Sequence, residues 1–575
     1  MALTLVQLSP VASLSSSRHP GGICEKQGPS VSPILQACTT RLVSSAGQVQ
    51  MSSQEQKKGL RSLFLSSFKL CQPLMAFQAA SMSTVMAAYA AGGSAGNSAV
   101  LDDGGAGLTS FVWSDPKRPR ICVLGGGFGG LYTALRLESL IWPPDKKPQI
   151  VLVDQCDRFV FKPLLYELLS KEVESWEVAP TFKDLLANSS VQFRQDTVKS
   201  IQPFDAVNGT PALATTSRDV GGSVYLSSGM QVDYDWLVLA LGSEPRMNFV
   251  PGASELAVPF STLEDALEVD RRLVALEKYA SPVTPAEVVV VGSGYCGIEL
   301  AATLAERLGN KGRIKVVDMA SDIVASAPAG NREAASKVLS SRNVELVLGY
   351  SVANMSSIEG ISVEGNISDR VRLELQQPSQ RPSRRASPGQ TIEVDLVLWT
   401  AGTQVSIPPS ETQSGYQSFP VNGRGQADTD EMLRVKGHPR IFALGDSAGT
   451  TDASGRTLPS TAQVAFQQAD YAGWNLWAAI NNRPLLPFRY QHLGEMMTLG
   501  TNDGAVSVSF IEGITLDGFL GHTARKLAYL YRLPTNEHKA KVGLSWLTKS
   551  TVSSISFLQE TISNTLIETA DSILK

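Results

Sequence analysis

Two glycine-rich turns of one pattern, about 170 residues apart, constrain the fold of this chain more than any other feature. An apolar segment comes before each turn, and a segment with helical spacing of apolar residues follows it. The first glycine of such a turn permits a tight bend, the second lets a pyrophosphate approach the backbone, and the third lets the helix pack on the strand. The glycines are Gly125, Gly127 and Gly130 in the first turn, and Gly292, Gly294 and Gly297 in the second. The sequence therefore predicts an α/β fold with two Rossmann-like dinucleotide-binding domains.

An acidic residue follows each turn, roughly twenty residues beyond its last glycine, where a ribose-binding carboxylate is expected. Asp154 ends the strand predicted over 150–153, and Asp318 ends the strand predicted over 314–317. A single turn of this kind is weak, because glycine-rich strand-to-helix turns are common, but strand, helix and acid accompany both copies. We expect FAD in the first site and NADH or NADPH in the second, because nicotinamide delivers a hydride to a flavin.

Three further buried segments end in glycine, and we interpret them as strands that reach the cofactors. They are 234–243, 395–403 and 440–447, which carry Gly242, Gly402 and Gly445. A glycine at a strand end lets the backbone come close to a ligand. We expect the carboxylate of Asp446 to point at the flavin's ribityl hydroxyls. The alternative is that it caps the next helix, and one residue can perform both roles. Gly402 is expected to let the nicotinamide lie close to the chain.

Charge is distributed unevenly along the chain. Residues 1–100 hold seven Lys or Arg and two acids, whereas the net charge of the whole chain is −4. A Ser-rich, acid-poor start predicts an organellar transit peptide, and abundant Ser with sparse Arg favours the chloroplast over the mitochondrion. The uncharged stretch 70–101 has weak hydropathy, which disfavours a membrane span. The negative balance also disfavours a nucleic-acid partner.

Cysteine and histidine contents exclude several redox and metal centres. The six cysteines form no CxxC pair, which disfavours a zinc ribbon, a disulfide scaffold and a dithiol centre. None of the five histidines is paired at metal-ligand spacing, so we expect no metal site. Cys296 lies inside the second turn without a resolving cysteine and is interpreted as a packing residue.

Three motifs resemble those of the type II NAD(P)H:quinone oxidoreductases, and the likeness runs from about residue 119 to the C-terminus. The motifs are FKPLLYELLS (161–170), VGSGYCGIELAATL (291–304) and LPSTAQVAFQQ (458–468). The stretch 521–546 is similar to a plastid and mitochondrial subgroup of plants. The resemblance implies FAD, NAD(P)H and a prenylquinone substrate such as plastoquinone, demethylphylloquinone or ubiquinone.

The resemblance also implies roles for individual residues. Glu299 matches a carboxylate between nicotinamide, flavin and quinone that relays protons; the alternative is an acid that merely favours a helix N-terminus. Gln463 and Gln467 lie four apart on one helix face and match the quinone site, Gln463 also lying against the flavin; the alternative is a solvated face. Pro163 and Leu164 match the loop over the flavin.

Two sequence details leave the chemistry open. Relatives carry a Lys or His after an FxYxD stretch, but here Leu493 stands at that point beside His492, which puts a proton partner from this segment in doubt. A carboxylate at Asp318 favours NADH by repelling a 2′-phosphate, although Lys315 and Arg332 are near in sequence and offset the repulsion if they approach it.

The C-terminal region predicts contact with a membrane surface. Residues 518–549 are rich in Lys and Arg, with Glu537 as the single acid, and Leu520, Ala524, Leu527, Ala528 and Tyr531 follow helical spacing. Val552, Ile555, Leu558, Ile562 and Leu566 continue an apolar repeat. Such an element suits an anionic membrane or a plastoglobule surface. The alternative is a helix packed on the core or on the other subunit of a homodimer.

The expected organisation has five segments: a leader (1–116), the FAD domain in two parts (117–258 and 404–484), an inserted NAD(P)H domain (259–403) and a membrane-anchoring or dimerising tail (485–575). The expected function is non-proton-pumping reduction of membrane prenylquinones at a thylakoid, plastoglobule or mitochondrial surface, which would balance the quinone pool and assist phylloquinone metabolism. The rival interpretations are a flavoprotein reductase of a protein partner such as ferredoxin, and a non-catalytic FAD-binding redox sensor.

Overall fold

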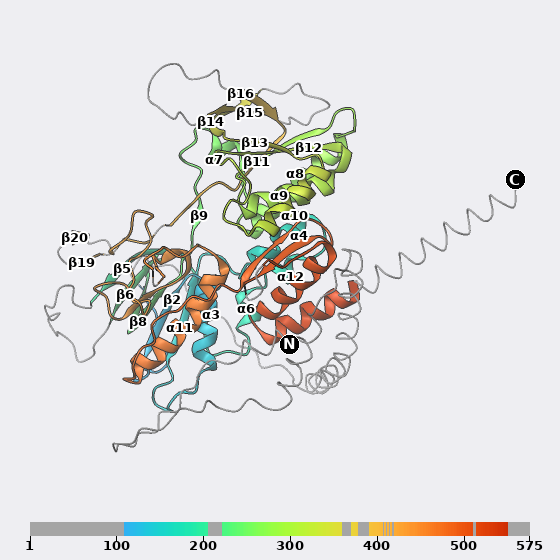
Figure 1. Cartoon of the computed structure of the whole chain (residues 1–575). Helices are drawn as coiled ribbons and strands as arrows, with labels where there is room; N and C mark the ends of the chain where they lie inside the picture. Colours follow the sequence, from blue (N-terminus) through green and yellow to red (C-terminus); the bar gives the residue numbers. More distant parts are fainter. Residues whose placement is uncertain are drawn as a thin grey trace, which may run out of the picture. The chain divides into compact units, whose positions relative to one another are not determined.

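The computed structural model describes residues 109–549, except 205–220, 359–369, 378–389, 406, 410, 413–414, 417–418, 453 and 510–512 (Figure 1). Contacts divide the chain into two compact units, residues 1–104 and 105–575, and every described residue belongs to the second. The predicted transit peptide and the apolar repeat beyond residue 550 therefore lie outside the described residues.

The first glycine-rich turn lies in a five-stranded parallel sheet with the order β21-β8-β2-β3-β4. The strands are β2 (Arg120–Leu124), β3 (Gln149–Asp154), β4 (Gln192–Gln195), β8 (Trp236–Leu239) and β21 (Ile441–Ala443). Two helices pack on each other beside this sheet: α3 (Phe128–Ser139) and α11 (Ala462–Ile480). Because β21 and α11 follow the second turn in sequence, this nucleotide-binding unit is assembled from two separated segments.

The second turn lies in a sheet of the same design, with the order β10-β17-β11-β12-β13 and all strands parallel. The strands are β10 (Val258–Pro259), β11 (Ala286–Val291), β12 (Gly312–Asp318), β13 (Glu345–Leu348) and β17 (Leu396–Trp399). The accompanying helices are α8 (Leu263–Tyr279), α9 (Tyr295–Leu308) and α10 (Ala329–Ser341). In both sheets the turn-bearing strand lies between the acid-bearing strand and a strand from much later in the chain. The predicted α/β fold with two Rossmann-like units is confirmed.

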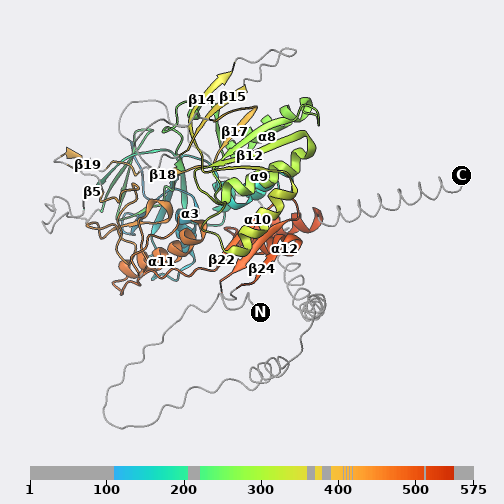
Figure 2. The ribbon, with the colours of Figure 1, turned by 45° about the horizontal axis from the view of Figure 1, so that its top comes forward.

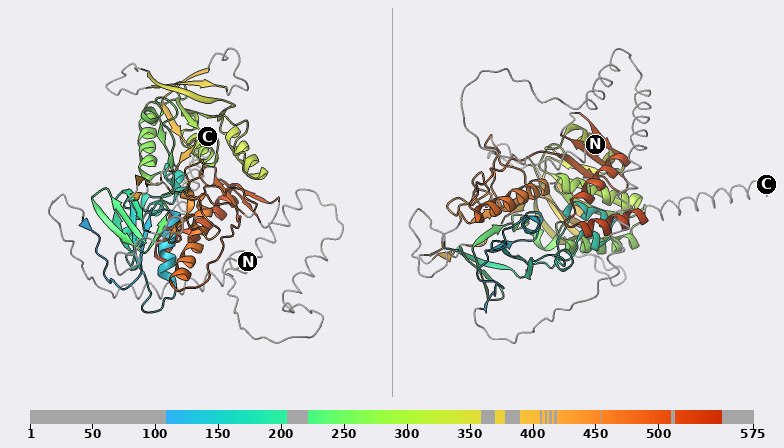
Figure 3. Two further views of the ribbon diagram at one scale, coloured as in Figure 1. Left: turned by 90° about the vertical axis from the view of Figure 1, so that its left-hand side faces the viewer. Right: turned by 90° about the horizontal axis from the view of Figure 1, so that it is seen from below.

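Smaller antiparallel elements complete each unit. One three-stranded sheet accompanies the second unit, as Figure 3 shows. A two-stranded pair lies where the chain passes between the units, a short helix precedes the second sheet, and another lies between α9 and β12. Their bounds are β14 (Ser351–Ile358), β15 (Arg370–Gln376) and β16 (Gln390–Val394) for the sheet, β9 (Glu244–Pro245) and β18 (Thr403–Gln404) for the pair, and α7 (Ala253–Leu256) and η3 (Gly309–Lys311) for the short helices. A further pair is β19 (Glu411–Thr412) with β20 (Gly415–Tyr416).

The apolar run of the segment 234–243 predicts a single strand, but the structure divides this segment between two sheets. Tyr234 ends β7 (Met230–Tyr234) in a different sheet, and β8 begins at Trp236. Asp235 breaks the run because its carboxylate accepts hydrogen bonds from the backbone N–H and the guanidinium of Arg120, at 2.8 Å and 2.7 Å. The same residue type performs the same task in the second unit, where Asp395 accepts from the backbone N–H of Glu287 at 2.8 Å.

The expected leader boundary at residue 116 is too far along the chain. Strand β1 (Thr109–Ser110) pairs with β7 in the sheet β1-β7-β6-β5, which also contains β5 (Val198–Pro203) and β6 (Gly222–Leu226). The indole N–H of Trp113 donates to the backbone carbonyl of Asp233 at 2.8 Å. Residues 109–116 therefore belong to the folded unit.

The C-terminal region forms a compact layer against the second nucleotide-binding unit, which contains the second glycine-rich turn. It contains the antiparallel sheet β22 (Gly494–Thr498), β23 (Gly504–Val508) and β24 (Thr515–Asp517), then α12 (Gly518–Arg532) and a helix over 536–549. Figure 2 shows β22, β24 and α12 beside α10, and Ser507 on β23 donates to Asn331 on α10 at 2.8 Å. Within the described ranges, no helix is both long enough and apolar enough to cross a membrane.

Candidate active site

The first glycine-rich turn leaves room for a ligand at its second glycine only. A Cβ atom added at Gly125, which has φ +93°, would lie 2.3 Å from the carbonyl oxygen of Ala240, and one at Gly130 would lie 1.8 Å from that of Gly125. A Cβ at Gly127 would meet no atom within 4 Å. Since Gly127 precedes helix α3, this open space faces unpaired N–H groups and the positive end of a helix dipole. The turn therefore fits a pyrophosphate.

The second turn repeats this geometry closely. A Cβ at Gly292, with φ +113°, would lie 2.5 Å from the hydroxyl of Thr400, and one at Gly297 would lie 1.9 Å from the carbonyl oxygen of Gly292. The corresponding position at Gly294 is open, at the start of α9. Two nucleotides can therefore approach the backbone, one in each sheet.

The two predicted ribose acids also hold their turns in place. Asp154 accepts from the backbone N–H of Gly126 at 2.6 Å, and Asp318 accepts from that of Ser293 at 2.5 Å. Burial raises the pKa of Asp154 despite these N–H donors. Of the two cations considered as neighbours of Asp318, Lys315 pairs with Glu345 and Arg332 with Asp322. Both cations are thus engaged by other acids.

Two of the strand-end glycines, Gly242 and Gly445, lie together with Asp446 as one group. The N–H of Gly242 (φ +76°) donates to Ser447 at 3.0 Å, and the hydroxyl of Ser243 donates to Asp446 at 2.5 Å. Asp446 lies within the short helix η4 (Gly445–Ser447) and caps no helix, because α11 is capped by the hydroxyl of Thr461. The capping alternative for Asp446 is therefore wrong.

Gly445 has a contact that the sequence did not indicate, whereas Gly402 was expected to lie close to a ligand. The N–H of Gly445 donates to the side-chain oxygen of the buried Gln468 at 2.6 Å. Gly402 has φ +76°, and a Cβ there would meet no atom within 4 Å, so a ligand can approach the backbone at this point.

Glu299 is buried where three parts of the chain meet. It lies on α9, one turn after the second glycine-rich turn, and its Oε1 accepts from the N–H of Thr498 on β22 at 2.9 Å. Its carboxyl also interacts with Tyr166 on α4 (Leu165–Leu169), within the FKPLLY motif. Burial raises the pKa of Glu299 to about 7, against the opposing effects of Thr498 and Arg525. A carboxyl with this pKa exchanges protons readily near neutral pH.

The flavin-loop motif begins with η2 (Lys162–Leu164), and Leu164 is fully buried while Pro163 is partly exposed. The chain then continues through α4, α5 (Ser175–Val178) and α6 (Phe182–Leu185). A Cβ at Gly126 would lie 2.2 Å from the ring of Phe182, so α6 closes over the first turn.

Gln463 and Gln467 share one face of α11, and both hold the segment 490–494. Gln463 accepts from the hydroxyl of Tyr490 at 2.7 Å and from the N–H of Leu493 at 3.0 Å. Gln467 pairs with the backbone of Gln491 through a donated bond of 2.8 Å and an accepted bond of 3.0 Å. The two amides therefore shape this segment, and a solvated helix face does not describe them.

Sequence reasoning missed several residues of this region. Glu167 on α4 forms buried ion pairs with Arg525 at 2.6 Å and Lys526 at 2.8 Å. Tyr166 lies inside a recognised motif and was within reach of sequence analysis. Arg525 and Thr498 were not, because they follow Glu299 by some two hundred residues and nothing local indicates the contact.

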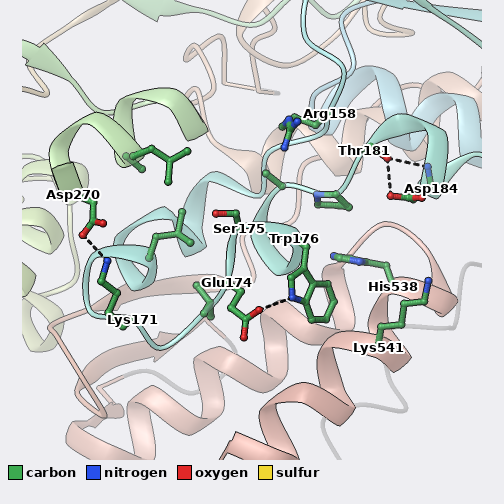
Figure 4. Close-up of a pocket in the computed structure, with 16 residues that line it drawn as sticks. Arg158, Lys171, Glu174, Ser175, Trp176, Thr181, Asp184, Asp270, His538 and Lys541 are labelled. Carbon is green, nitrogen blue, oxygen red and sulfur yellow. Dashed lines mark hydrogen bonds and ion pairs between the residues drawn. The ribbon is translucent and has the colours of Figure 1, made fainter.

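A separate pocket of about 740 Å³ lies between α8, the segment 171–184 and the helix 536–549 (Figure 4). Its charged groups are satisfied within the protein: Lys171 pairs with Asp270 at 2.6 Å, and Trp176 donates to Glu174 at 2.9 Å. It includes none of the glycines of either turn and not Glu299. We assign it no ligand.

Comparisons with known proteins agree with this geometry. Residues 119–469 match the pyridine nucleotide-disulphide oxidoreductase family. The chain is 55% identical to the alternative NAD(P)H-ubiquinone oxidoreductase C1, chloroplastic/mitochondrial, of Arabidopsis thaliana, over 80% of this chain and 86% of the relative. It is 43% identical to the demethylphylloquinone reductase NdbB of Synechocystis, over 75% and 96%.

The structure is also similar to NDH2 of Plasmodium falciparum in complex with NADH, with a TM-score of 0.57 and 16% identity over 75% of this chain and 98% of that one. This likeness concerns the fold. The two open turns fit the cofactors of such enzymes, FAD and NAD(P)H. By its sequence and its fold, the chain belongs to the pyridine nucleotide-disulphide oxidoreductase family and, within it, to the type II NAD(P)H:quinone oxidoreductases.

Proposed function

We propose that this chain transfers electrons from NADH or NADPH to a membrane prenylquinone, without pumping protons. The first glycine-rich turn holds FAD and the second takes NAD(P)H, in domains bounded as the sequence predicts, apart from the shorter leader. The flavin held there would supply the chemistry that links hydride transfer from the nicotinamide to two-electron reduction of the quinone. The named activities of the relatives from Arabidopsis and Synechocystis support this assignment.

The observation that carries the proposal is the position of Glu299. Reduction of a quinone to a quinol takes up two protons along with two electrons, so the site needs a group that supplies protons. Glu299 joins the second nucleotide turn, the FKPLLY motif and the C-terminal layer, and its raised pKa suits proton transfer near neutral pH. Gln463 and Gln467 orient the quinone, either through their remaining donor capacity or through the segment 490–494.

A membrane surface is supported by the outer side of the C-terminal helices. Phe519, Leu520, Leu527 and Tyr531 of α12, with Leu544 and Leu547 of the following helix, are between 41% and 69% exposed. On α12 the buried side chains are His522, Arg525 and Tyr529, and this polar inner side is the reverse of an ordinary surface helix. An exposed apolar face of this kind suits insertion into the headgroup region of a bilayer or lipid droplet. Two cations of the predicted basic patch, Arg525 and Lys526, are engaged inside the protein.

The cellular setting follows from the acid-poor leader and the name of the Arabidopsis relative. We infer a chloroplast protein at a thylakoid or plastoglobule surface, with the mitochondrion as a second site. There it balances the redox state of a quinone pool and assists phylloquinone metabolism.

The test is steady-state turnover of the purified protein with NADH and NADPH against decyl-plastoquinone, a naphthoquinone and ferredoxin. We expect turnover with the two quinones. Turnover with ferredoxin alone would identify a reductase of a protein partner. FAD binding without turnover of any acceptor would identify a redox sensor.

A further inference from the structure

Helix α12 turns its polar side toward the protein. His522, Arg525 and Tyr529 are buried, and their spacing puts them on one side of the helix. Arg525 has no exposed surface at all. Arginine is almost never fully buried unless it is paired, so its position needs a specific explanation.

Stability does not account for this arrangement. Arg525 Nη2 lies 2.6 Å from Oε1 of Glu167, and the guanidinium stacks over the ring of Tyr529 at 5.3 Å. Its Nε and Nη1, however, make no hydrogen bond with any described residue. A buried ion pair with unsatisfied donors is often no more stable than an apolar replacement, because desolvation offsets the attraction.

Residues next to this ion pair interact with Glu299. Glu167 follows Tyr166 on α4, and Tyr166 interacts with the carboxyl of Glu299. The titratable and charged groups that face Glu299 come from three elements: Tyr166 and Glu167 on α4, Tyr295 and Cys296 on α9, and Arg525 and Tyr529 on α12. Arg525 is the cation of this set.

A further acid lies beside the pair: burial and the charge of Glu167 raise the pKa of Glu172 to about 7, and this carboxyl lies 3.6 Å from His522 and 3.9 Å from Lys526. Lys526 bonds the second oxygen of Glu167 at 2.8 Å. Burial and the charge of Arg525 lower the pKa of His522 to about 4, so His522 is neutral at physiological pH. Burial would raise the pKa of Glu167, but Arg525 and Lys526 outweigh it and hold that carboxyl ionised. Arg525 therefore keeps its positive charge, which lowers the pKa values of Glu167, Glu172 and Glu299.

We propose that Arg525, fully buried and anchored by Glu167, is a positioning residue for proton delivery and acts on Glu299 through its positive charge. This inference rests on the proposed function. In each turnover the quinone would receive two electrons and one proton from the reduced flavin and its second proton from Glu299, which regains a proton from the solvent, while Arg525 neither gains nor loses one. The residue supplies positive charge from α12.

The tail is consequently part of the active site as well as a surface. Thr498 on β22 and Arg525 on α12 both act on Glu299, whereas Leu527 on the same helix is exposed on the other side. A truncation after residue 516 would remove Arg525 together with the apolar face and would not separate membrane binding from chemistry.

The experiment compares four variants of the full, FAD-loaded chain: Arg525→Met, Glu167→Gln, Arg525→Lys and, as the matched control, Lys526→Met, which also loses a contact with Glu167. The first measurement is the pH dependence of flavin reoxidation by decyl-plastoquinone. The second is an infrared titration of the protonated carboxyl, which needs no quinone. The signal of Glu299 is obtained by subtracting the spectrum of the same variant that also carries Glu299→Gln.

Substitutions at the two partners of the ion pair should shift the midpoint of the pH titration of Glu299 in opposite directions. We expect Arg525→Met to raise it by about one pH unit and Glu167→Gln to lower it. Arg525→Lys should restore the original profile, and Lys526→Met should leave it unchanged. A purely structural defect would not produce opposite shifts. An unchanged midpoint in folded Arg525→Met, or an equal shift in Lys526→Met, overturns the proposal.

If Arg525→Met fails to fold, the double variant Glu167→Gln/Arg525→Met removes both charges and replaces it. Its midpoint should stay above that of the unmodified protein, since Arg525 affects Glu299 more than Glu167 does; an unchanged midpoint again overturns the proposal. If the infrared midpoint shifts as expected while no quinone is reduced, the proposed function fails and the role of Arg525 at Glu299 stands.

Discussion

The backbone N–H of Thr498 donates a hydrogen bond of 2.9 Å to Oε1 of Glu299, across 199 residues of sequence. This contact ties the C-terminal sheet to the helix that follows the second nucleotide turn. The N–H group stabilises the charged form of Glu299, while burial favours the protonated form, and burial prevails. The carboxyl thus has a pKa of about 7 at a buried point where α9, α4 and β22 meet.

The first prediction concerns quinone reduction. Glu299→Gln keeps the hydrogen bond from Thr498 but cannot supply a proton, so flavin reoxidation by decyl-plastoquinone should fall about 100-fold or more. Flavin reduction by NADH should change little, and stopped-flow absorbance measures the two steps separately. Glu333→Gln, at an exposed position on α10, serves as the control. Equal rates for the Glu299 variant and the control would remove Glu299 from the mechanism.

The same substitution should alter the pH dependence of stability. The pKa of Glu299 is about 7 in the folded protein, above its ordinary value of 4.5, so the folded state retains a proton that the unfolded state loses. The associated stability is present below pH 4.5 and disappears as the pH rises through 7. Glu299→Gln should therefore raise Tm relative to the unmodified protein at pH 8, and this gain should shrink toward pH 5. Calorimetry showing the same difference at both pH values would contradict the buried, protonated carboxyl.

Alanine at the two open glycines should separate the nucleotide sites. Gly127→Ala and Gly294→Ala introduce a methyl group that meets no protein atom within 4 Å, so both variants should fold. We expect the first to be purified with much less FAD, and the second to retain FAD but show a KM for NAD(P)H raised about tenfold or more. Flavin absorbance and steady-state kinetics provide the measurements. The reverse pattern would exchange the two assignments.

The nicotinamide preference should depend on Asp318. Its carboxylate repels a 2′-phosphate, and Lys315 and Arg332 are paired with other acids. Asp318→Asn keeps an oxygen that accepts from Ser293 and removes the charge. The ratio of kcat/KM for NADPH to that for NADH should rise about tenfold. A ratio that does not rise would show that another residue sets the preference.

Membrane binding should depend on the outer face of the C-terminal helices. Leu527→Glu combined with Leu547→Glu places charge on two side chains that are 61% and 69% exposed, and flotation with anionic liposomes should fall strongly. Val274→Glu, on the exposed side of α8, is the matched control. Turnover of a water-soluble quinone should persist in the double variant, because Arg525 and Glu299 are untouched. Undiminished flotation would exclude this face as the anchor.

Local sequence patterns were sufficient for the nucleotide sites. Strand, glycine turn, helix and acid follow one another within a short stretch. Positions that have no room for a side chain, such as Gly125 and Gly130, are occupied by glycine and can be recognised in the sequence. The same holds for the parallel sheets, since buried parallel strands are apolar runs. The break at Asp235 escaped this reasoning, because an aspartate within an apolar run has meaning only once Arg120 lies beside it.

Tertiary structure alone decided how the C-terminal helix is used. The spacing of Leu520, Leu527, Arg525 and Tyr529 separates two sides of α12, but periodicity is the same whichever side faces inward. Glu167, more than three hundred residues earlier, turns the charged side into the protein and leaves the leucines outside. The sequence by itself thus determined two nucleotide-binding units and their acids, because those depend on neighbours along the chain. The proton site around Glu299 depends on charges brought together by folding, and no local pattern records them.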